Sequence, residues 1–309
     1  MTASAGGGTL GPPPVAPAEI VRRLRPGFTT RYAPAPTGSL HLGHVVNAIW
    51  VWGLARAAAG RVLLRLEDHD RLRCRPEFDA GIVADLAWLG FVPDAPAVRQ
   101  SERQALYDEA LARLAGEGLV YACDCTRREI AANAAPEDRE LRYPGTCRER
   151  AVDLAATPIR RVRLDTETIE LDDLRLGVRR QVPAEQCGDL VVRDRNGNWS
   201  YQFAVVVDDL EQGVDLVVRG VDLLASTGRQ IQLAALLGRA APPRFLHHGL
   251  LVRADGTKLS KALRDEGVRD LRAAGWSAEQ VIGSAAHAAG LQAAPRPLPA
   301  SDVAELFAG

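Results

Sequence analysis

The amino-acid sequence predicts an α/β fold, in which a Rossmann-like parallel sheet binds a nucleotide and is interrupted by a β-rich insertion. Three observations lead to this prediction. Short apolar runs alternate with helical stretches over residues 28–122, an order typical of a parallel sheet covered by helices. Strand-like runs then follow one another over residues 159–219. The helical pattern returns after Asp222.

The first half contains four expected strands and three expected helices. The first strand covers residues 28–32 and is ended by Pro34 and Pro36. An apolar helix over 42–59 follows and stops at Gly60. Further strands are expected at 61–66, at Val98 and at 119–121, and further helices at 78–89 and 101–115.

The second half begins with strands expected at 162–164, 189–192, 203–207 and 216–218, with a hairpin turn at 196–198. A helical stretch to Leu237, a strand over 245–252 and a helix over 278–289 complete it. We therefore divide the chain into a flexible extension (1–27), the first half of the α/β domain (28–122), an insertion (123–218), the second half (219–289) and a poorly ordered tail (290–309).

Composition excludes several classes of protein. The 309 residues include 38 basic and 39 acidic ones, so a strongly basic nucleic-acid coat is excluded, although a local basic groove is not. Because no apolar run reaches about 18 residues, we expect no transmembrane helix. The N-terminus lacks the order of a signal peptide, which predicts a cytoplasmic protein. The even charge balance and the lack of heptads predict a monomer.

The turn at residues 35–44 joins the first expected strand to the first expected helix. At such a turn an α/β fold presents backbone N–H groups to an anion. Gly38 and Gly43 allow a nucleotide to approach closely. His41 and His44 are three residues apart, so they share a helix face and can both donate to phosphate oxygens. A glycine-rich turn with two surface histidines is the alternative interpretation.

Lysine is confined to a single loop. Of the 38 basic residues 36 are arginines, and the only lysines are Lys258 and Lys261, within residues 255–261. Two ammonium groups beside a triphosphate would stabilise charge on a departing pyrophosphate. A solvated loop is the alternative, but it does not explain why both lysines lie together.

These segments resemble the HIGH and KMSKS signatures of class I aminoacyl-tRNA synthetases. Residues 31–38, 65–70, 201–209 and 218–222 resemble those of the glutamyl-tRNA synthetases in particular, and the resemblance covers about residues 28–290. It implies activation of L-glutamate with ATP and Mg²⁺, and four catalytic residues: His41, His44, Lys258 and Lys261. It also implies an ATP site formed by Pro36, Thr37, Gly38, His41, Gly43, His44, Lys258, Ser260 and Lys261.

The expected glutamate site follows both from this resemblance and from the chemistry of the substrate. Arg31 and Arg219 can each hold a carboxylate, Glu67 can pair with the ammonium group, and Tyr201 can donate to the side-chain carboxylate. The resemblance adds Ala33. An ion pair of Glu67 with Arg65, and a surface position for Arg219, are the structural alternatives.

Only 48 residues follow Lys261, which is too few for the anticodon-binding domain of the glutamyl-tRNA synthetases. The shortened chain resembles their stand-alone paralogue, whose activity is to attach glutamate to the queuosine base in the anticodon of tRNA(Asp). Two rivals stay open: an enzyme that charges a tRNA 3′ end, and a catalytically vestigial RNA-binding paralogue.

A group of cysteines points to a metal site in the insertion. Cys123, Cys125 and Cys147 are soft ligands suited to zinc, but a fourth ligand is missing from this pattern. The resemblance supplies Tyr143, so that one structural Zn²⁺ is expected. Three reduced thiols are the alternative. RNA is expected over this module, where five arginines gather: Arg127, Arg128, Arg142, Arg148 and Arg150.

Overall fold

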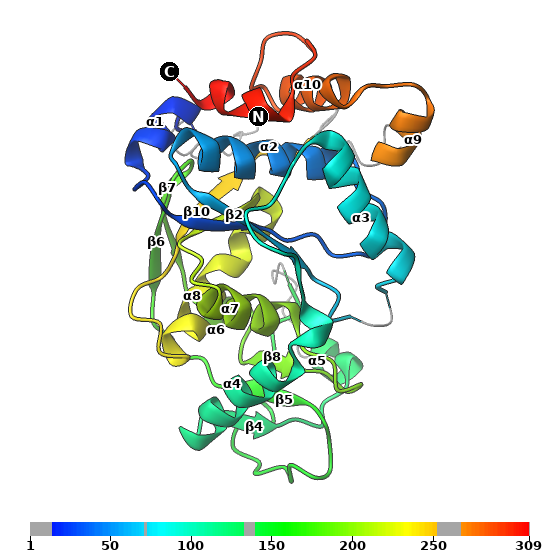
Figure 1. The fold of residues 1–309 in the computed structure, drawn as a ribbon. Coiled ribbons are helices and arrows are strands. Elements are labelled where there is room, and N and C mark those ends of the chain that lie inside the picture. The colour runs from blue at the N-terminus through cyan, green and yellow to red at the C-terminus, as the bar shows by residue number, and fades with distance from the viewer. Residues whose placement is uncertain (1–13, 71–72, 133–139, 252–266, 309) are drawn as a thin grey trace, which may run out of the picture.

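The structure, a computed structural model, describes residues 14–70, 73–132, 140–251 and 267–308. A large sheet lies between two layers of helices, and a small sheet lies at one end of the molecule (Figure 1). The strands are β1 (Thr29–Tyr32), β2 (Arg61–Leu66), β3 (Val98–Arg99), β4 (Val120–Ala122), β5 (Arg160–Val162), β6 (Ile169–Asp173), β7 (Gly177–Gln181), β8 (Leu190–Arg193), β9 (Leu216–Gly220) and β10 (Arg244–His248).

The α-helices are α1 (Pro17–Arg23), α2 (Leu42–Ala57), α3 (Pro76–Leu89), α4 (Gln104–Gly116), α5 (Arg127–Ala132), α6 (Pro183–Gln186), α7 (Tyr201–Glu211), α8 (Thr227–Leu236), α9 (Val268–Ala273) and α10 (Ala278–Ala288). In the described part of the chain, the 3-10 helices are η1 (Gln100–Glu102), η2 (Val221–Ser226) and η4 (Ala300–Phe307). Within the described residues no helix is both long and apolar enough to span a bilayer.

The large sheet confirms the expected parallel core. Its strand order is β3-β2-β1-β9-β10-β6-β7, and the strands from β3 to β6 run parallel while β7 runs antiparallel to β6. The order reverses beside β1, because the chain first builds outward to β3 and then returns on the other side. In open α/β sheets ligands bind beyond the carboxyl ends of the strands at such a point. The topology therefore brings the ends of β1, β2, β9 and β10 together.

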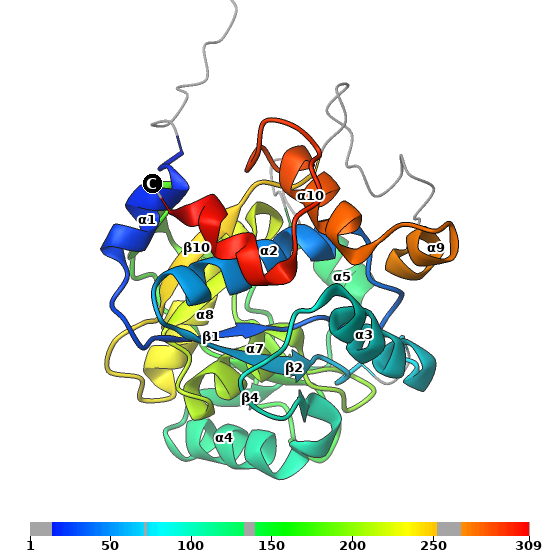
Figure 2. The ribbon, with the colours of Figure 1, turned by 45° about the horizontal axis from the view of Figure 1, so that its top comes forward.

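Helix α2 is the centre of the core. It is buried from Val45 to Ala55 apart from Asn47, and a helix that is apolar on all sides needs cover on both of its faces. The sheet covers one face, and η4 and α10 cover the other (Figure 2). Phe307 packs edge-on against Trp50 with ring centroids 5.1 Å apart. A Cβ at Gly53 would lie 2.1 Å from the Phe307 ring, so this contact requires glycine.

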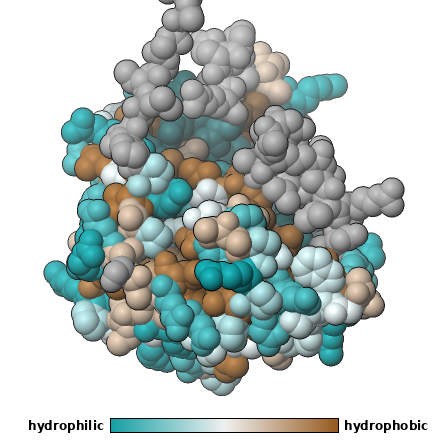
Figure 3. Space-filling model, turned by 90° about the horizontal axis from the view of Figure 1, so that it is seen from above, coloured by the Kyte–Doolittle hydropathy of each residue, from teal (hydrophilic) through white to brown (hydrophobic). Residues whose placement is uncertain are grey.

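The two ends of the chain differ from the expectation. The predicted flexible extension (1–27) contains α1, in which Ile20 is fully buried. The predicted poorly ordered tail (290–309) contains η4, which buries Val303 and Phe307. The physical reason is the outer face of α2, whose apolar side chains need a partner. Figure 3 shows the molecule from the side on which η4 and α10 lie, where hydrophobic and hydrophilic residues alternate over short distances.

The predicted insertion (123–218) is divided between the two sheets. The β6–β7 hairpin extends the large sheet beside β10, and β9 lies in the middle of that sheet. The rest forms the small antiparallel sheet β4-β5-β8. The strand predicted at 119–121 as a fourth parallel strand corresponds to β4, which pairs with β5 of the small sheet. Strand propensity alone did not specify which strand β4 pairs with.

The predicted strand at 203–207 is wrong, because these residues lie in helix α7. The run is buried on all sides, and a short continuous apolar run does not distinguish a strand from a buried helix. The N-cap favours the helix, because the Ser200 hydroxyl accepts from the backbone N–H of Phe203 at 3.3 Å.

Candidate active site

The turn after β1 leads into α2, and its two histidines cap the helix. Nδ1 of His41 accepts from the backbone N–H of Gly43, and Nδ1 of His44 accepts from that of His41, both at 3.1 Å. The ring centroids lie 4.0 Å apart. Burial, followed by the nearby His41, lowers the pKa of His44 to about 3. Because Nδ1 accepts in both rings, Nε2–H is the donor that each neutral ring offers to a ligand.

The other predicted ATP residues surround this turn. A Cβ at Gly43 would lie 2.9 Å from the His41 ring, whereas at Gly38 it would meet open space. Pro36 lines a cavity of about 470 Å³ between the turn and the start of α3, and Thr37 is exposed. The predicted loop residues Lys258, Ser260 and Lys261 lie outside the described residues.

A buried network of ion pairs lies at the carboxyl ends of β1 and β2. Arg31 Nε donates to Asp209 Oδ1 at 3.1 Å, and Arg65 Nη1 donates to the same oxygen at 2.7 Å. Arg65 Nη2 also donates to Glu67 Oε1 at 3.1 Å. Burial raises the pKa of Glu67 against the opposing effect of Arg65 and Arg31. Burial also acts to raise the pKa of Asp209, but the two arginines outweigh it and lower that pKa.

Arg219, at the end of β9, is held differently. Its side chain is buried and donates to four neutral acceptors: from Nε to His247 Nε2 at 3.0 Å, from Nη1 to Gln230 Oε1 at 2.6 Å, and from Nη2 to Thr227 Oγ1 at 2.9 Å and the Leu223 carbonyl at 3.3 Å. Within the described residues, no ion pair joins Arg219 to a carboxylate. Burial accordingly lowers the pKa of Arg219. A buried cation without a counter-charge is costly, which suits a position where a ligand supplies the anion.

The structure brings the predicted glutamate residues together. Tyr201, at the start of α7, interacts electrostatically with Glu67, Arg219 and Arg31, although burial is the main cause that raises its pKa. Ala33, half-buried, follows β1 directly. The alternative of a surface charge at Arg219 is wrong. The alternative ion pair of Glu67 with Arg65 is present, and it lies inside the same cluster.

Sequence reasoning gave no role to several buried polar residues here. Asp208 is fully buried and accepts from Gln100, Arg103 and Tyr107, while Asp209 joins the two arginines described above. A signal was available, since two acidic residues end a long apolar run and buried aspartates are nearly always paired. His247 and Asp173 gave no comparable signal, because they are 74 residues apart.

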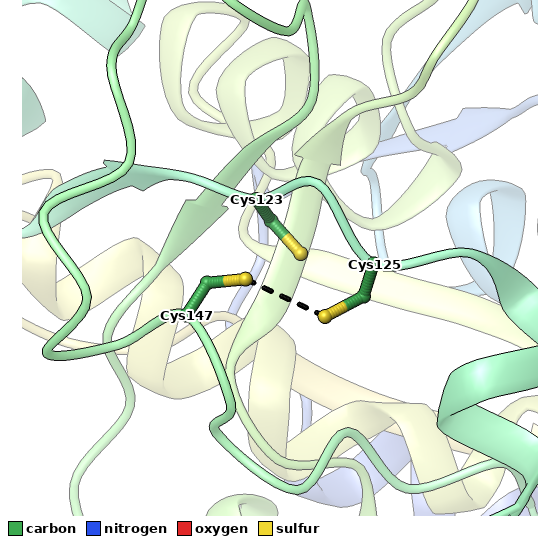
Figure 4. A group of neighbouring side chains, drawn as sticks. All are labelled: Cys123, Cys125 and Cys147. Carbon is green, nitrogen blue, oxygen red and sulfur yellow. Dashed lines mark hydrogen bonds between the residues drawn. The ribbon is translucent and has the colours of Figure 1, made fainter.

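The cysteine cluster lies in the small-sheet module (Figure 4). The Sγ atoms of Cys123, Cys125 and Cys147 lie within 4.8 Å of one another. Tyr143 Oη lies 3.6 Å from Cys123 Sγ and accepts from the backbone N–H of Cys147 at 2.8 Å. Burial and the neighbouring thiols raise the pKa of Cys125 to about 12. The three thiols could hold a metal ion, and cysteine thiolates are ligands that zinc takes in structural sites, while Tyr143 lies beside Cys123 and Cys147.

The arginines expected to contact RNA are only partly available. Arg148 donates to Asp189 at 3.0 Å, and Arg150 pairs with Asp124 at 3.1 Å. These ion pairs lie within the module, so both side chains already have structural partners. The other three, Arg127, Arg128 and Arg142, are exposed.

The fold and these residues define a class I tRNA synthetase catalytic domain, and the comparisons agree. The family described as tRNA synthetases class I (E and Q), catalytic domain, matches residues 28–281. A glutamate tRNA ligase from Elizabethkingia meningosepticum, solved in complex with its amino acid, superposes with a TM-score of 0.75 at 26% identity. The glutamate-tRNA synthetase from Elizabethkingia anophelis gives 0.75 at 25%. Each match covers 91% of this chain, which spans 65% and 66% of those two chains.

Relatives found by sequence identify the subgroup of class I tRNA synthetases to which the chain belongs. A protein named glutamyl-Q tRNA(Asp) synthetase from Burkholderia cenocepacia is 44% identical, with 81% of this chain and 88% of the relative covered. Its namesake from Symbiobacterium thermophilum is 43% identical, with 90% and 91% covered. The chain therefore belongs to the glutamyl-Q tRNA(Asp) synthetase family, a group of class I enzymes of the glutamate–tRNA ligase type.

Proposed function

We propose that this protein activates L-glutamate with ATP and transfers it to the queuosine base in the anticodon of tRNA(Asp). The observation that carries the first half is Arg219, a buried cation whose described partners are all neutral. An amino acid with two carboxylates supplies the missing charge. The names of the relatives support the second half.

The glutamate site has a role for each predicted residue. Arg219 binds one substrate carboxylate, with the Tyr201 hydroxyl donating beside it. Arg31 donates from Nε to Asp209 and from Nη1 to the Val218 carbonyl, and it offers its remaining Nη hydrogens to the other carboxylate. Glu67 keeps one carboxylate oxygen on Arg65 and presents the other to the ammonium group. A dicarboxylic amino acid is thereby favoured over glutamine, whose amide brings no negative charge to Arg219.

Adenylate formation needs no protein nucleophile, because the α-carboxylate of glutamate attacks the α-phosphorus and pyrophosphate leaves. The protein supplies position and charge. His41 and His44 donate from Nε2 as neutral groups, and Lys258 and Lys261 add positive charge at the pyrophosphate. Magnesium enters with ATP and neutralises part of the triphosphate charge.

ATP–pyrophosphate exchange with glutamate, glutamine and aspartate, each in the absence of RNA, tests this activation step. We expect exchange with glutamate only. The Lys261→Ala variant should keep its affinity for glutamate and lose most of its exchange activity. Unchanged exchange in that variant would remove the lysine loop from the mechanism. Exchange by the wild type only after tRNA is added would favour an enzyme that charges a tRNA 3′ end, and absence of exchange both without and with tRNA would favour a vestigial binding protein.

The acceptor is identified by locating the transferred glutamate. Radiolabelled glutamate on tRNA(Asp) that contains queuosine should resist cleavage of the 3′-terminal adenosine and should disappear with the anticodon loop. The second candidate, charging of a 3′ end, is favoured by the similarity to two glutamate–tRNA ligases. Glutamate lost with the terminal adenosine would establish that candidate. The cytoplasmic location and the monomeric state remain predictions.

We further propose that Cys123, Cys125, Tyr143 and Cys147 hold one structural zinc ion. The support is their convergence within the small-sheet module. The ion would join the β4 end of the module to the segment that carries Tyr143 and Cys147. Metal analysis of the purified protein should give about one zinc per chain, and Cys147→Ser should lower it. Cys187→Ser, which alters a thiol outside the cluster, is the matched control; equal zinc in all three proteins would contradict the assignment.

A further inference from the structure

A buried chain of hydrogen bonds reaches Arg219 from β6, the strand next to the edge of the large sheet. Asp173 on β6, His247 on β10 and Arg219 on β9 lie on three neighbouring strands, and all three are buried. Asp173 Oδ2 lies 2.6 Å from His247 Nδ1, and His247 Nε2 lies 3.0 Å from Arg219 Nε. Neither Asp173 nor His247 takes part in the proposed reaction.

The partners of this chain determine where its protons lie. A guanidinium N–H can only donate, so His247 Nε2 must accept, and its single ring proton lies on Nδ1. Asp173 Oδ2 accepts that proton's hydrogen bond, while Oδ1 accepts from the backbone N–H groups of Arg175 and Leu176 at 3.0 and 2.9 Å. Both oxygens of Asp173 therefore act as acceptors, and they select one tautomer of His247.

We propose that Asp173 and His247 are positioning residues, which fix the Arg219 guanidinium in the orientation that binds a substrate carboxylate. This inference rests on the proposed function of Arg219. With Nε held by His247, Nη1 by Gln230 and Nη2 by Thr227, the plane of the guanidinium is set before the substrate arrives. Pre-organisation of this kind lowers the cost of binding, since less freedom is lost on association.

In this arrangement the β6–β7 hairpin supports the groups that hold the Arg219 guanidinium. It carries Asp173, and its Gln181 Oε1 accepts from the backbone N–H of Gly228 at 2.7 Å. Gly228 lies between Thr227 and Gln230 on α8, the two residues that hold the Nη groups of Arg219. The hairpin therefore contacts both His247 and the start of α8, the two elements that hold the guanidinium.

Asp173→Asn is the sharpest test, because it changes the tautomer with little change of shape. The amide oxygen would stay on the two backbone N–H groups, and the NH₂ group would face His247 Nδ1. The ring proton would then move to Nε2 and point at the Arg219 Nε–H. We expect KM for glutamate in ATP–pyrophosphate exchange to rise about 10- to 100-fold, the range known for loss of a residue that orients a metal-binding side chain, with kcat and KM for ATP near wild type.

His247 variants separate positioning from a general loss of packing. His247→Gln keeps an acceptor near the position of Nε2, so KM for glutamate should stay close to wild type. His247→Leu removes the acceptor and should behave like Asp173→Asn. His248→Gln is the matched control, because this buried histidine lies on the same strand but contacts Asn47, so KM for glutamate should not change.

The pH profile provides a second readout. The charged groups that face His247 are Asp173 from β6, Arg219 from β9 and Arg31 from β1, with the Thr227 hydroxyl from α8. Protonation of His247 would place a donor and a positive charge against Arg219. Burial lowers the pKa of His247, so KM for glutamate in the wild type should rise only as the pH falls well below the ordinary histidine value of about 6.5, and this rise should be absent in His247→Gln. ¹⁵N NMR should show the Nδ1–H tautomer in the wild type and not in Asp173→Asn.

The outcomes distinguish this inference from the proposed function. A wild-type protein without glutamate-dependent exchange and without glutamate binding in calorimetry overturns the proposed function itself. Exchange in the wild type together with unchanged KM in Asp173→Asn and His247→Leu overturns the positioning role alone. If Asp173→Asn does not fold, as judged by circular dichroism, the comparison of His247→Gln with His247→Leu decides the question: equal KM values overturn it.

Discussion

The two sides of the candidate glutamate site differ in whether their buried arginines are paired with carboxylates. On the paired side, Arg31 and Arg65 share Asp209, and Arg65 also binds Glu67. On the unpaired side, Arg219 is surrounded by His247, Gln230 and Thr227, none of which carries a counter-charge in this arrangement. Both sides are buried, so the difference does not come from solvent.

The comparison shows how a fold separates structural charge from functional charge. Ion pairs on the paired side compensate one another, so this side is complete without a ligand. The unpaired side orients its cation with neutral dipoles and leaves the charge to be compensated from outside. Removal of Asp209, the counter-charge shared by Arg31 and Arg65, should therefore affect stability, and removal of Arg219 should affect binding.

The largest expected effect is on the stability of the paired side. Asp209→Ala leaves Arg31 and Arg65 buried with much of their negative partner lost, which should cost about 3–5 kcal/mol in the free energy of unfolding. Urea denaturation measures it. The matched control is Asp172→Ala, which removes an exposed pair with Arg23 and should change stability by less than about 1 kcal/mol. Similar losses in both variants would contradict the role of buried pairing.

Arg219→Met should have the opposite effect, with little loss of stability and a large loss of affinity for glutamate. It orphans no carboxylate, so the unfolding free energy without ligand should stay the same or rise. The affinity for glutamate should fall about 100-fold or more, as expected for the loss of a buried charged partner. Calorimetric titration with glutamate and thermal unfolding give the two values. A loss of stability as large as that of Asp209→Ala would show that Arg219 belongs to the structural side.

The smallest expected effect concerns His44, a neutral group in the first turn of α2. Its folded-state pKa of about 3 lies below the ordinary histidine value of about 6.5, so the unfolded chain takes up its proton first as the pH falls. Stability should therefore decrease as the pH drops from about 6.5 toward 3. His44→Gln should decrease less over the same range in urea titrations at several pH values; an identical slope would indicate that other groups control it.

The sequence determined the features that depend on local pattern. The parallel-sheet core, the helix α2 with His41 and His44 at its start, and the proximity of Cys123 to Cys125 were predicted from residues close together in the chain. Resemblance to known motifs also indicated Arg31, Glu67, Tyr201 and Arg219, which the fold brings together. Periodicity and motif spacing are sufficient where neighbours in sequence are neighbours in space.

Only the tertiary structure decided the rest. The run 203–207 became a helix because it is buried on every side, and η4 is ordered because α2 needs a cover for its outer face. The strands β6 and β9 joined the large sheet through partners far away in the chain. The same holds for the link from Asp173 through His247 to Arg219. Its members come from three strands, and their hydrogen bonds exist only once the sheet has formed, because donor and acceptor positions are set by strand pairing and not by sequence spacing.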